Sequence, residues 1–364
     1  MKLKTLVITV ALLAGLSLVA YLRNRPMAEA PADPRVGKAV LDADTASRAA
    51  GLVITDQGKK VELARGADGA WRVTSYFGLP ASFDKIARFV QDLNEAKVDR
   101  FVTSSPETIA RLEFKDSVVS VRDQDGKEIW SVTLGKTPES GNGRFIRFGT
   151  EPKAFFSSLH AWLDTDSKGW ASTALVPAKP EDIAKVEIPF DGAKTVVLSR
   201  AKKDAPWTTD ATPAGRKLSA DKVSSAVSTL TALTFSDTTD PKDGAAAAAS
   251  KYARTFRLTT FDGKTLTVAL GRTPEVKTLK VPAADAKEPI APPPVTADGK
   301  ADIKPITPEF DTTPAGPVFA VVTSSDAHAP INDLMKLRAF KVDDFSFTGL
   351  PQKADELFEP APAK

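Results

Sequence analysis

An internal repeat is the feature that most constrains what this chain can fold into. The segment Leu134–Glu139 (LGKTPE) recurs 136 residues later as Leu270–Glu275 (LGRTPE), and a Trp recurs at the same interval. Two further landmarks, an Asp-Gly-Lys turn and the start of a helical pattern, recur at an interval of 137 residues, at Asp125 and Asp262 and at Asp84 and Asp221. Because these landmarks keep one order and intervals that differ by one residue, the sequence predicts two homologous repeats.

Each repeat is predicted to contain antiparallel hairpins and one main helix. Alternating segments over 118–122 and 128–134 flank the first Asp-Gly pair, which is a strong hairpin signal, and the second copy repeats it. Apolar residues at helical spacing follow Asp84 and Asp221. A short apolar helix is expected near the end of each repeat, over Phe155–Leu163 and Ile331–Leu337. The predicted fold class is therefore α+β, with two homologous repeats, each of antiparallel β-hairpins with one main α-helix and a short second helix.

The N-terminus carries a membrane-targeting segment. Residues 5–22 are uncharged and are flanked by Lys2, Lys4, Arg23 and Arg25. A helix of this length spans about 27 Å, enough to cross the hydrocarbon core of a bilayer. A cleaved signal peptide is the alternative, but Pro31 follows the candidate cleavage motif at 28–30. We expect an uncleaved anchor over residues 1–25, a single pass through the inner (cytoplasmic) membrane and a body in the periplasm.

The rest of the chain divides by composition and by the repeat. We expect a Pro- and Ala-rich tether, then the first and second repeats, and then a flexible tail, over residues 26–50, 51–188, 189–350 and 351–364. The second repeat contains an insert with no equivalent in the first, over 276–316, which includes the run Ala291–Pro294. This insert is predicted to be either a mobile loop or a Pro-rich contact arm.

Composition excludes several classes of function. The chain has 49 basic and 46 acidic residues, and four of the basic ones flank the apolar segment, so the body is close to neutral and lacks the charge of a nucleic-acid-binding protein. There is no Cys and there are only two His, His160 and His328, which argues against thiolate or multi-His metal sites. No nucleotide-binding loop or nucleophile elbow is present. We therefore predict no catalytic, metal or cofactor-binding residue, and a protein that is not an enzyme.

Two sets of residues are candidates for contact with a partner. The repeated Gly-Lys/Arg-Thr-Pro-Glu element is either a structural turn or a polar contact site, with the candidate residues Lys136, Thr137, Glu139, Arg272, Thr273 and Glu275. The repeated Trp71 and Trp207 are either core anchors or exposed platforms on which a sugar could stack.

These features together resemble a family of uncharacterised bacterial envelope proteins, known only as a domain of unknown function. The anchor, the strand with its Trp, the capped helix and the Gly-Lys-Thr-Pro strand ending carry the resemblance, over about residues 50–350. Members are single-anchor proteins encoded beside ABC-type transport or gliding-motility components. The resemblance implies a membrane location and ABC-type subunits as partners, and it carries over no catalytic residue.

The resulting expectation is a non-enzymatic, membrane-anchored periplasmic protein that scaffolds or regulates an ABC-type membrane complex. The first alternative is an envelope module that binds a glycan or a peptide in a groove between the repeats. A hydrolase that uses Ser, Lys or an acidic residue is the second alternative.

Overall fold

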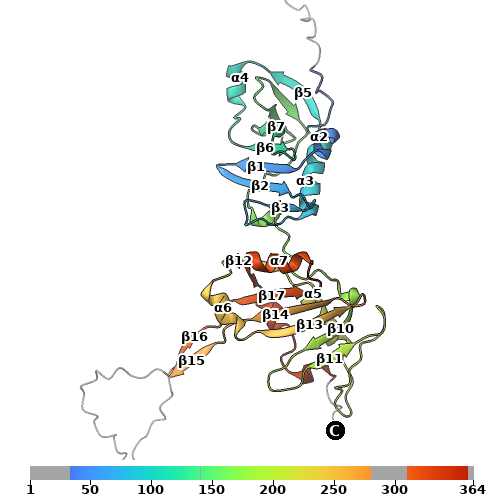
Figure 1. Cartoon of the computed structure of the whole chain (residues 1–364). Coiled ribbons are helices and arrows are strands. Elements are labelled where there is room, and N and C mark those ends of the chain that lie inside the picture. The colour runs from blue at the N-terminus through green and yellow to red at the C-terminus, as the bar shows by residue number, and fades with distance from the viewer. Residues whose placement is uncertain (1–32, 140, 280–309, 360–364) are drawn as a thin grey trace, which may run out of the picture. The chain divides into compact units, whose positions relative to one another are not determined.

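The computed structural model describes residues 33–139, 141–279 and 310–359. The chain divides into two compact units between Ser172 and Thr173, called unit 1 and unit 2 below (Figure 1). The fold is mixed α/β, with antiparallel sheets and few helices, as the sequence predicts at this level. The predicted anchor over residues 1–25 lies outside the described residues, and no helix within them is long and apolar enough to cross a membrane.

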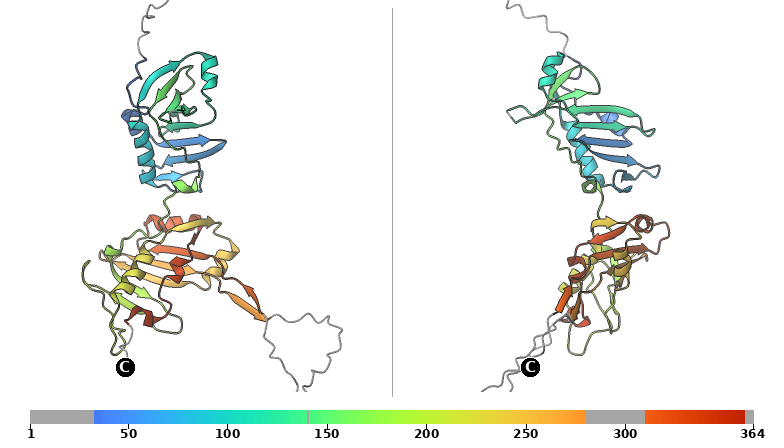
Figure 2. Two further views of the ribbon diagram at one scale, coloured as in Figure 1. Left: turned by 180° about the vertical axis from the view of Figure 1, so that it is seen from behind. Right: turned by 90° about the vertical axis from the view of Figure 1, so that its left-hand side faces the viewer.

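Unit 1 is built on one antiparallel sheet with the strand order β4-β3-β2-β1-β6-β7-β8-β9-β5. The strands are β1 (Gly51–Asp56), β2 (Lys59–Arg65), β3 (Trp71–Val73), β4 (Leu79–Pro80), β5 (Val98–Thr103), β6 (Val118–Arg122), β7 (Glu128–Leu134), β8 (Arg144–Phe148) and β9 (Ala154–Ser157). The helices are α2 (Ala43–Ser47), α3 (Phe83–Glu95), α4 (Pro106–Arg111) and the short 3₁₀ helix η1 (Lys168–Trp170). Figure 2 shows α3 running across the strands β1, β2 and β3.

The main helix of unit 1 forms where the apolar pattern predicts it. Ile86, Phe89 and Leu93 are buried on one side of α3, and Ser82 occupies the N-cap position. These side chains recur at helical spacing, so one stripe of the helix faces the sheet while the opposite face remains in solvent. The burial of this stripe fixes α3 on the sheet and thereby positions the residues of its first turns, which matter for the site below.

Unit 2 is built on a sheet with the strand order β11-β10-β13-β14-β17-β18-β12. The strands are β10 (Ile183–Ile188), β11 (Val196–Ser199), β12 (Phe235–Thr239), β13 (Arg254–Thr260), β14 (Thr265–Gly271), β17 (Val318–Ser324) and β18 (Ala339–Val342). The helices are η2 (Pro180–Asp182), α5 (Ala220–Thr231), α6 (Gly244–Ser250), α7 (Pro330–Leu337), α8 (Phe345–Thr348) and η3 (Ala354–Leu357). The unit begins earlier than the predicted boundary at 188/189 because β10 pairs with both β11 and β13.

The two sheets share an order of strands. Without β3 and β4, unit 1 has the order β2-β1-β6-β7-β8-β9-β5, and each strand stands where its counterpart stands in unit 2. The helix α3 precedes the edge strand β5, as α5 precedes the edge strand β12. In both sheets, the strand that follows the main helix therefore lies at one edge, beside the last strand of the unit.

Both predicted Asp-Gly hairpins are confirmed. The pair Asp125-Gly126 joins β6 to β7, and Asp262-Gly263 joins β13 to β14, with antiparallel registers. Gly126 and Gly263 have φ angles of 76° and 84°, in the left-handed region that glycine adopts without a steric penalty. The turn residues therefore fix the register of the central strands of each sheet.

The short helix predicted over Phe155–Leu163 is wrong. Residues 154–157 form β9, which pairs with β8 on one side and β5 on the other. The following residues alternate instead of recurring at helical spacing, with Leu159, Ala161 and Leu163 buried and the residues between them exposed. The equivalent prediction over Ile331–Leu337 is confirmed as α7.

The predicted tether and tail are partly packed structure. From Asp33 onward the tether belongs to unit 1, where Val40 and Leu41 are buried and bond through their backbone N–H groups to Ala96 and Leu93. The predicted tail packs its Leu357 side chain into unit 2. Some apolar side chains of these Pro- and Ala-rich segments are buried in the cores of the two units. Composition alone does not predict this burial.

The ends of the predicted insert form a two-stranded ribbon. The strands β15 (Val276–Leu279) and β16 (Phe310–Thr313) pair antiparallel. Figures 1 and 2 show the ribbon projecting from the unit 2 sheet. Residues 280–309, the middle of the insert, lie outside the described residues.

Candidate functional site

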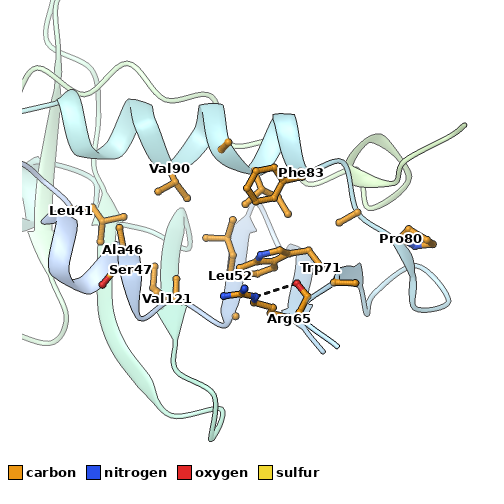
Figure 3. A pocket seen from close by; sticks show the side chains of 17 residues that line it. Leu41, Ala46, Ser47, Leu52, Arg65, Trp71, Pro80, Phe83, Val90 and Val121 are labelled. Carbon is orange, nitrogen blue, oxygen red and sulfur yellow. Dashed lines mark hydrogen bonds between the residues drawn. The ribbon is translucent and has the colours of Figure 1, made fainter. Parts of the chain in front are cut away.

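An open groove lies between α3, α2 and one end of the unit 1 sheet (Figure 3). Its volume is about 570 Å³, within the range of typical ligand pockets. The groove is mostly apolar, and its lining consists of Leu41, Ala46, Ser47, Ala49, Gly51, Leu52, Arg65, Gly69, Ala70, Trp71, Pro80, Ala81, Phe83, Ile86, Ala87, Val90 and Val121. Helix, strands and turns all contribute to it, so the groove is a property of the fold of unit 1.

Small side chains explain why this space stays open. Ala46 and Ala49 lie on the α2 side, and Ala87 lies on α3, where longer side chains would reach across. At Gly51 of β1, an added Cβ atom would lie 3.1 Å from the Cβ atom of Arg122 in β6, so the two strands approach each other closely there. Phe83, in the first turn of α3, leaves 64% of its side chain exposed at the rim. The exposed ring therefore adds apolar surface beside the hollow.

Trp71 forms one end wall of the groove. It lies in β3, directly opposite Arg65 of β2, and it is half-buried and lines the hollow in Figure 3. Trp207 is also half-buried. Neither side chain is a fully buried core anchor. That role belongs to Trp170, which is 1% exposed and packs edge-on against Phe89 at 5.6 Å.

Arg65 is the one charged residue of the groove lining. It is exposed, and its Nε donates to the carbonyl oxygen of Gly69 at 3.1 Å. A guanidinium carries five N–H donors and no acceptor, so the terminal nitrogens of Arg65 can donate hydrogen bonds to a carboxylate. Neighbouring Arg72 pairs instead with Asp68 and holds the pKa of that carboxyl well below its usual range.

The repeated Gly-Lys/Arg-Thr-Pro-Glu elements lie outside the groove lining. Lys136, Thr137 and Glu139 are exposed together after β7. A side chain at the preceding Gly135 would place its Cβ 2.6 Å from the carbonyl oxygen of Leu112, so close backbone approach requires glycine there. The first copy thus has a clear structural reason for its Gly.

The second copy makes more contacts. Arg272 pairs with Asp344 and lies 5.1 Å from the ring centre of Phe347. The carbonyl of Thr273 accepts the backbone N–H of Gly316, and Glu275 pairs with Lys277 at 3.3 Å. These contacts hold the base of the β15–β16 ribbon, which favours the structural interpretation for this copy.

Comparison with known proteins places the chain in a family. Residues 71–252 match the family described as Domain of unknown function (DUF4340). The chain belongs to this family. No curated protein and no solved structure matches it.

The DUF4340 match begins at Trp71 and includes Trp207, so it covers parts of both units. It contains Phe83 and the α3 side of the groove but begins after α2 and Arg65. The open groove of this DUF4340 chain is therefore completed by residues that precede the match.

The two His residues of the DUF4340 chain lie apart from the groove lining. The His160 ring nitrogens are 3.2 Å from the backbone N of Gly143 and 2.6 Å from the carbonyl oxygen of Ser158. His328 lies in the turn before α7, where its backbone N–H donates to Asp326. Within the described residues, no group of three or more acidic or His side chains is placed to hold a metal ion.

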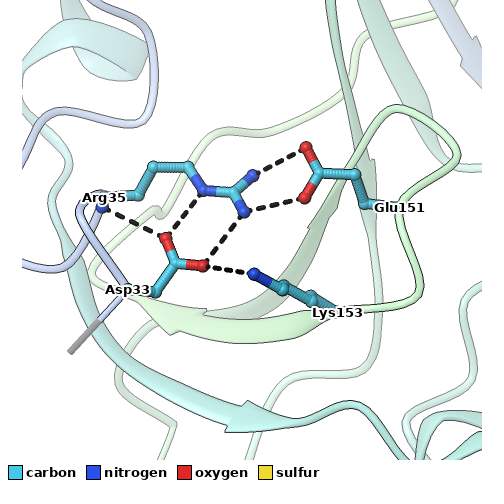
Figure 4. Close-up of polar contacts among 4 residues, drawn as sticks. All are labelled: Asp33, Arg35, Glu151 and Lys153. Atoms are coloured by element: carbon cyan, nitrogen blue, oxygen red, sulfur yellow. Dashed lines mark hydrogen bonds and ion pairs between the residues drawn. The ribbon is translucent and has the colours of Figure 1, made fainter. Parts of the chain in front are cut away.

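A polar cluster fastens the start of unit 1 in this DUF4340 chain (Figure 4). Arg35 donates to both oxygens of Glu151, at 3.0 and 2.7 Å, and to Asp33, which also accepts from Lys153 at 3.0 Å. The Arg35 hydrogen bond and, to a lesser extent, Lys153 hold the pKa of Asp33 well below its usual range, against the effect of burial. Glu151 and Lys153 lie more than a hundred residues from Arg35 and Asp33, so no local pattern indicates that the two segments meet.

Proposed function

We propose that this chain is a non-enzymatic binding protein whose unit 1 groove captures an apolar segment of a partner polypeptide. Residues 5–22 would anchor it as a single pass in the cytoplasmic membrane, with the body in the periplasm, as the uncharged run and its flanking charges indicate. The partner we favour is a subunit of an ABC-type membrane complex, which the family resemblance implies. The protein would scaffold or regulate that complex.

The observation that carries this proposal is the open, apolar and nearly uncharged lining of the groove. A helix presents apolar side chains at intervals of three and four residues, and grooves beside a helix bind such segments. Trp71 and Phe83 provide aromatic contact area, and aromatic residues carry much of the binding energy in interfaces. Exposed Arg65 at the edge favours a segment that also carries a carboxylate.

A charge placed in the groove tests the proposal. Ala87 is exposed on α3 and lines the groove, so Ala87→Glu adds a charge without disturbing the buried stripe. Ser224, exposed on α5 of unit 2, provides the matched control Ser224→Glu. Each full-length protein is purified from native membranes, and the proteins recovered with it are identified by mass spectrometry.

We expect ABC-type permease or ATPase subunits with the unchanged protein and with the Ser224→Glu control, and their loss with Ala87→Glu. If no such subunit were recovered with the unchanged protein, the proposal of an ABC-type partner would be contradicted. Equal recovery with all three proteins would contradict the groove as the place of binding.

The internal duplication also belongs to this proposal. The shared strand order supports it. So do two equivalent bridges before the main helices, Ala81 to Ala171 in unit 1 and Leu218 to Phe358 in unit 2.

A further inference from the structure

Trp162 is the most exposed of the large apolar side chains in the described residues, with 85% of its surface in solvent. Its neighbours on both sides, Ala161 and Leu163, are buried in unit 1. The chain therefore cannot turn the indole inward without withdrawing two core residues. Trp162 is held outward by the packing of its own backbone.

The indole borders a hollow whose other walls are polar. The hollow has a volume of about 630 Å³ and lies between the loop after β9 and the turn that joins β1 to β2. Besides Trp162 and Leu163, its lining consists of Asp56, Gln57, Lys59, Asp164, Thr165 and Asp166. None of these residues lines the groove of the proposed function.

The polar wall is fixed as firmly as the indole. Asp164 accepts from Lys85 and from the backbone N of Asp166, and Asp56 accepts from Ser117. Gln57 has φ of 50°, and Gly58 follows at 76°, which forms a tight two-residue turn. A non-glycine residue pays a small energetic cost for this conformation. The side chains around the hollow are thus carried by an ordered loop and an ordered turn.

We propose that this hollow is a binding site for a pyranose sugar. A pyranose has one face of C–H groups, which stacks on an indole, and a rim of hydroxyl groups, which bonds to carboxylate and amide groups. The indole with the acidic and amide side chains matches both features. Three carboxylates and one Lys in the lining favour neutral or amino sugars over acidic ones.

The same charges argue against a membrane surface as the occupant. Exposed Trp side chains also occur at lipid interfaces, but anionic head groups attract Lys and Arg and repel carboxylates. Asp56, Asp164 and Asp166 outnumber Lys59 around the indole, and Lys85 is already paired with Asp164. The wall therefore fits a polyhydroxylated ligand better than a lipid head group.

Titration calorimetry on the full-length chain, in a detergent without a sugar head group, tests the site. The probes are a glucosamine tetramer, cellotetraose as a neutral glycan and tetragalacturonate as an acidic one. We expect the first two to bind, the glucosamine tetramer more tightly, and the acidic probe to produce no heat. Absence of binding by both of the first two probes would overturn the proposal.

Variants locate the binding. Trp162→Ala is expected to weaken it at least about tenfold, Trp162→Phe to restore part of it, and Asp166→Asn to weaken the glucosamine tetramer selectively. The control Tyr252→Ala, at an exposed aromatic of unit 2, should change nothing. Unaltered binding by Trp162→Ala, or a Trp162-dependent association with lipid vesicles in place of sugar, would overturn it. Ala87→Glu leaves this site intact, so failure of the groove proposal and failure of this one are distinguishable.

Discussion

Each unit has an arginine across a hairpin from a tryptophan, but the two arginines are hydrogen-bonded differently. Arg65 lies opposite Trp71 in unit 1 and donates its Nε to Gly69. In unit 2, Arg200 donates to the carbonyl oxygens of Ile183, Lys203 and Pro180, at 2.7, 2.6 and 2.6 Å. Its guanidinium carbon lies 4.7 Å from the ring centre of Trp207. A guanidinium with three carbonyl acceptors is therefore held beside the neighbouring ring, whereas a guanidinium with one acceptor remains exposed.

The segment before the first strand supplies one of the three acceptors of Arg200. In unit 2 this segment is η2, which offers the carbonyl oxygen of Pro180 to Arg200. In unit 1 the equivalent place holds α2, whose carbonyl groups at Asp42, Thr45 and Ala46 accept backbone N–H groups of α2 and of the turn after it. The Arg65 side chain donates instead to Gly69, in the turn of its own hairpin.

The largest effect on stability is expected from the residues that pack and bond at the N-terminus of each main helix. Trp170 does this in unit 1, with its carbonyl bonded to Ser82, and Leu357 does it in unit 2, with its carbonyl bonded to Ser219. Trp170→Ala should lower the free energy of unfolding of unit 1 by about 3–5 kcal/mol, because it leaves a large cavity. Hydrogen exchange read by peptide mass spectrometry reports each unit separately.

In that experiment, Leu357→Ala should act on unit 2 alone, by about 2–5 kcal/mol. The exposed Trp162→Ala is the control and should change stability by less than about 0.5 kcal/mol. If Trp170→Ala lowered protection in unit 2 as much as in unit 1, the two closures would not be independent.

A smaller effect separates the two arginines. Arg200→Ala removes a guanidinium bonded to three carbonyl oxygens, and should destabilise unit 2 by about 2–3 kcal/mol. Arg65→Ala removes one exposed bond and should cost less than about 1 kcal/mol. Hydrogen exchange again measures each unit. Equal losses of stability would mean that the additional hydrogen bonds of Arg200 contribute nothing to the free energy of unfolding.

Acid should affect unit 1 through Asp33. Because the folded-state pKa of Asp33 lies below its unfolded value of about 3.9, its ion pairs stabilise the fold above that pH and are lost as the pH falls. The end of unit 2 is fastened differently: Arg254 and Arg216 donate to backbone carbonyls, which do not titrate, and Arg216 also pairs with the exposed Asp355.

Asp33→Asn should therefore lower the stability of unit 1 by about 1.5–3 kcal/mol at pH 7. The variant should also reduce the loss of stability between neutral pH and pH values below about 4. Unfolding at a series of pH values measures both. A variant with an unchanged pH dependence would show that other carboxylates dominate.

The smallest effect on stability is expected at the groove rim. Phe83→Ser removes an exposed ring and should change the free energy of unfolding by less than about 0.5 kcal/mol. Recovery of the partner from membranes should nevertheless fall. Phe345→Ser, at an exposed ring of unit 2, is the matched control, and equal recovery with both variants would remove the rim from the interface.

Local patterns predict the hairpins and main helices well. The bounds of β6 and β7 agree with the alternating segments around Asp125-Gly126, and α3 and α5 follow the apolar stripes. The strand β1 carries no alternating signal, because Leu52, Val53 and Ile54 are all buried. The residues around Phe155 form a strand because they pair on both sides, with β8 and β5.

The candidate site follows less directly from sequence. Trp71 is singled out by the repeat, but the sequence does not show that it lines an apolar groove, because the other lining residues come from several separate elements. The small residues that keep the groove open come from separate elements and form no motif, as Ala46 and Ala87 illustrate. Trp162 belongs to no repeated landmark, and only the burial of its neighbours shows that it is held in solvent.

The strand order has a consequence for the kinetics of folding. The edge strand β5 pairs with β9, which places Val98 opposite Ser157. In unit 2, the edge strand β12 pairs with β18 and places Phe235 opposite Val342, so the loop that must close includes the whole insert. Closing a loop about twice as long costs about 0.6 kcal/mol more, and non-local pairing slows folding. Unit 2 should therefore acquire its last strand later than unit 1. Its unpaired edge is the surface most exposed to wrong pairing with another chain during folding.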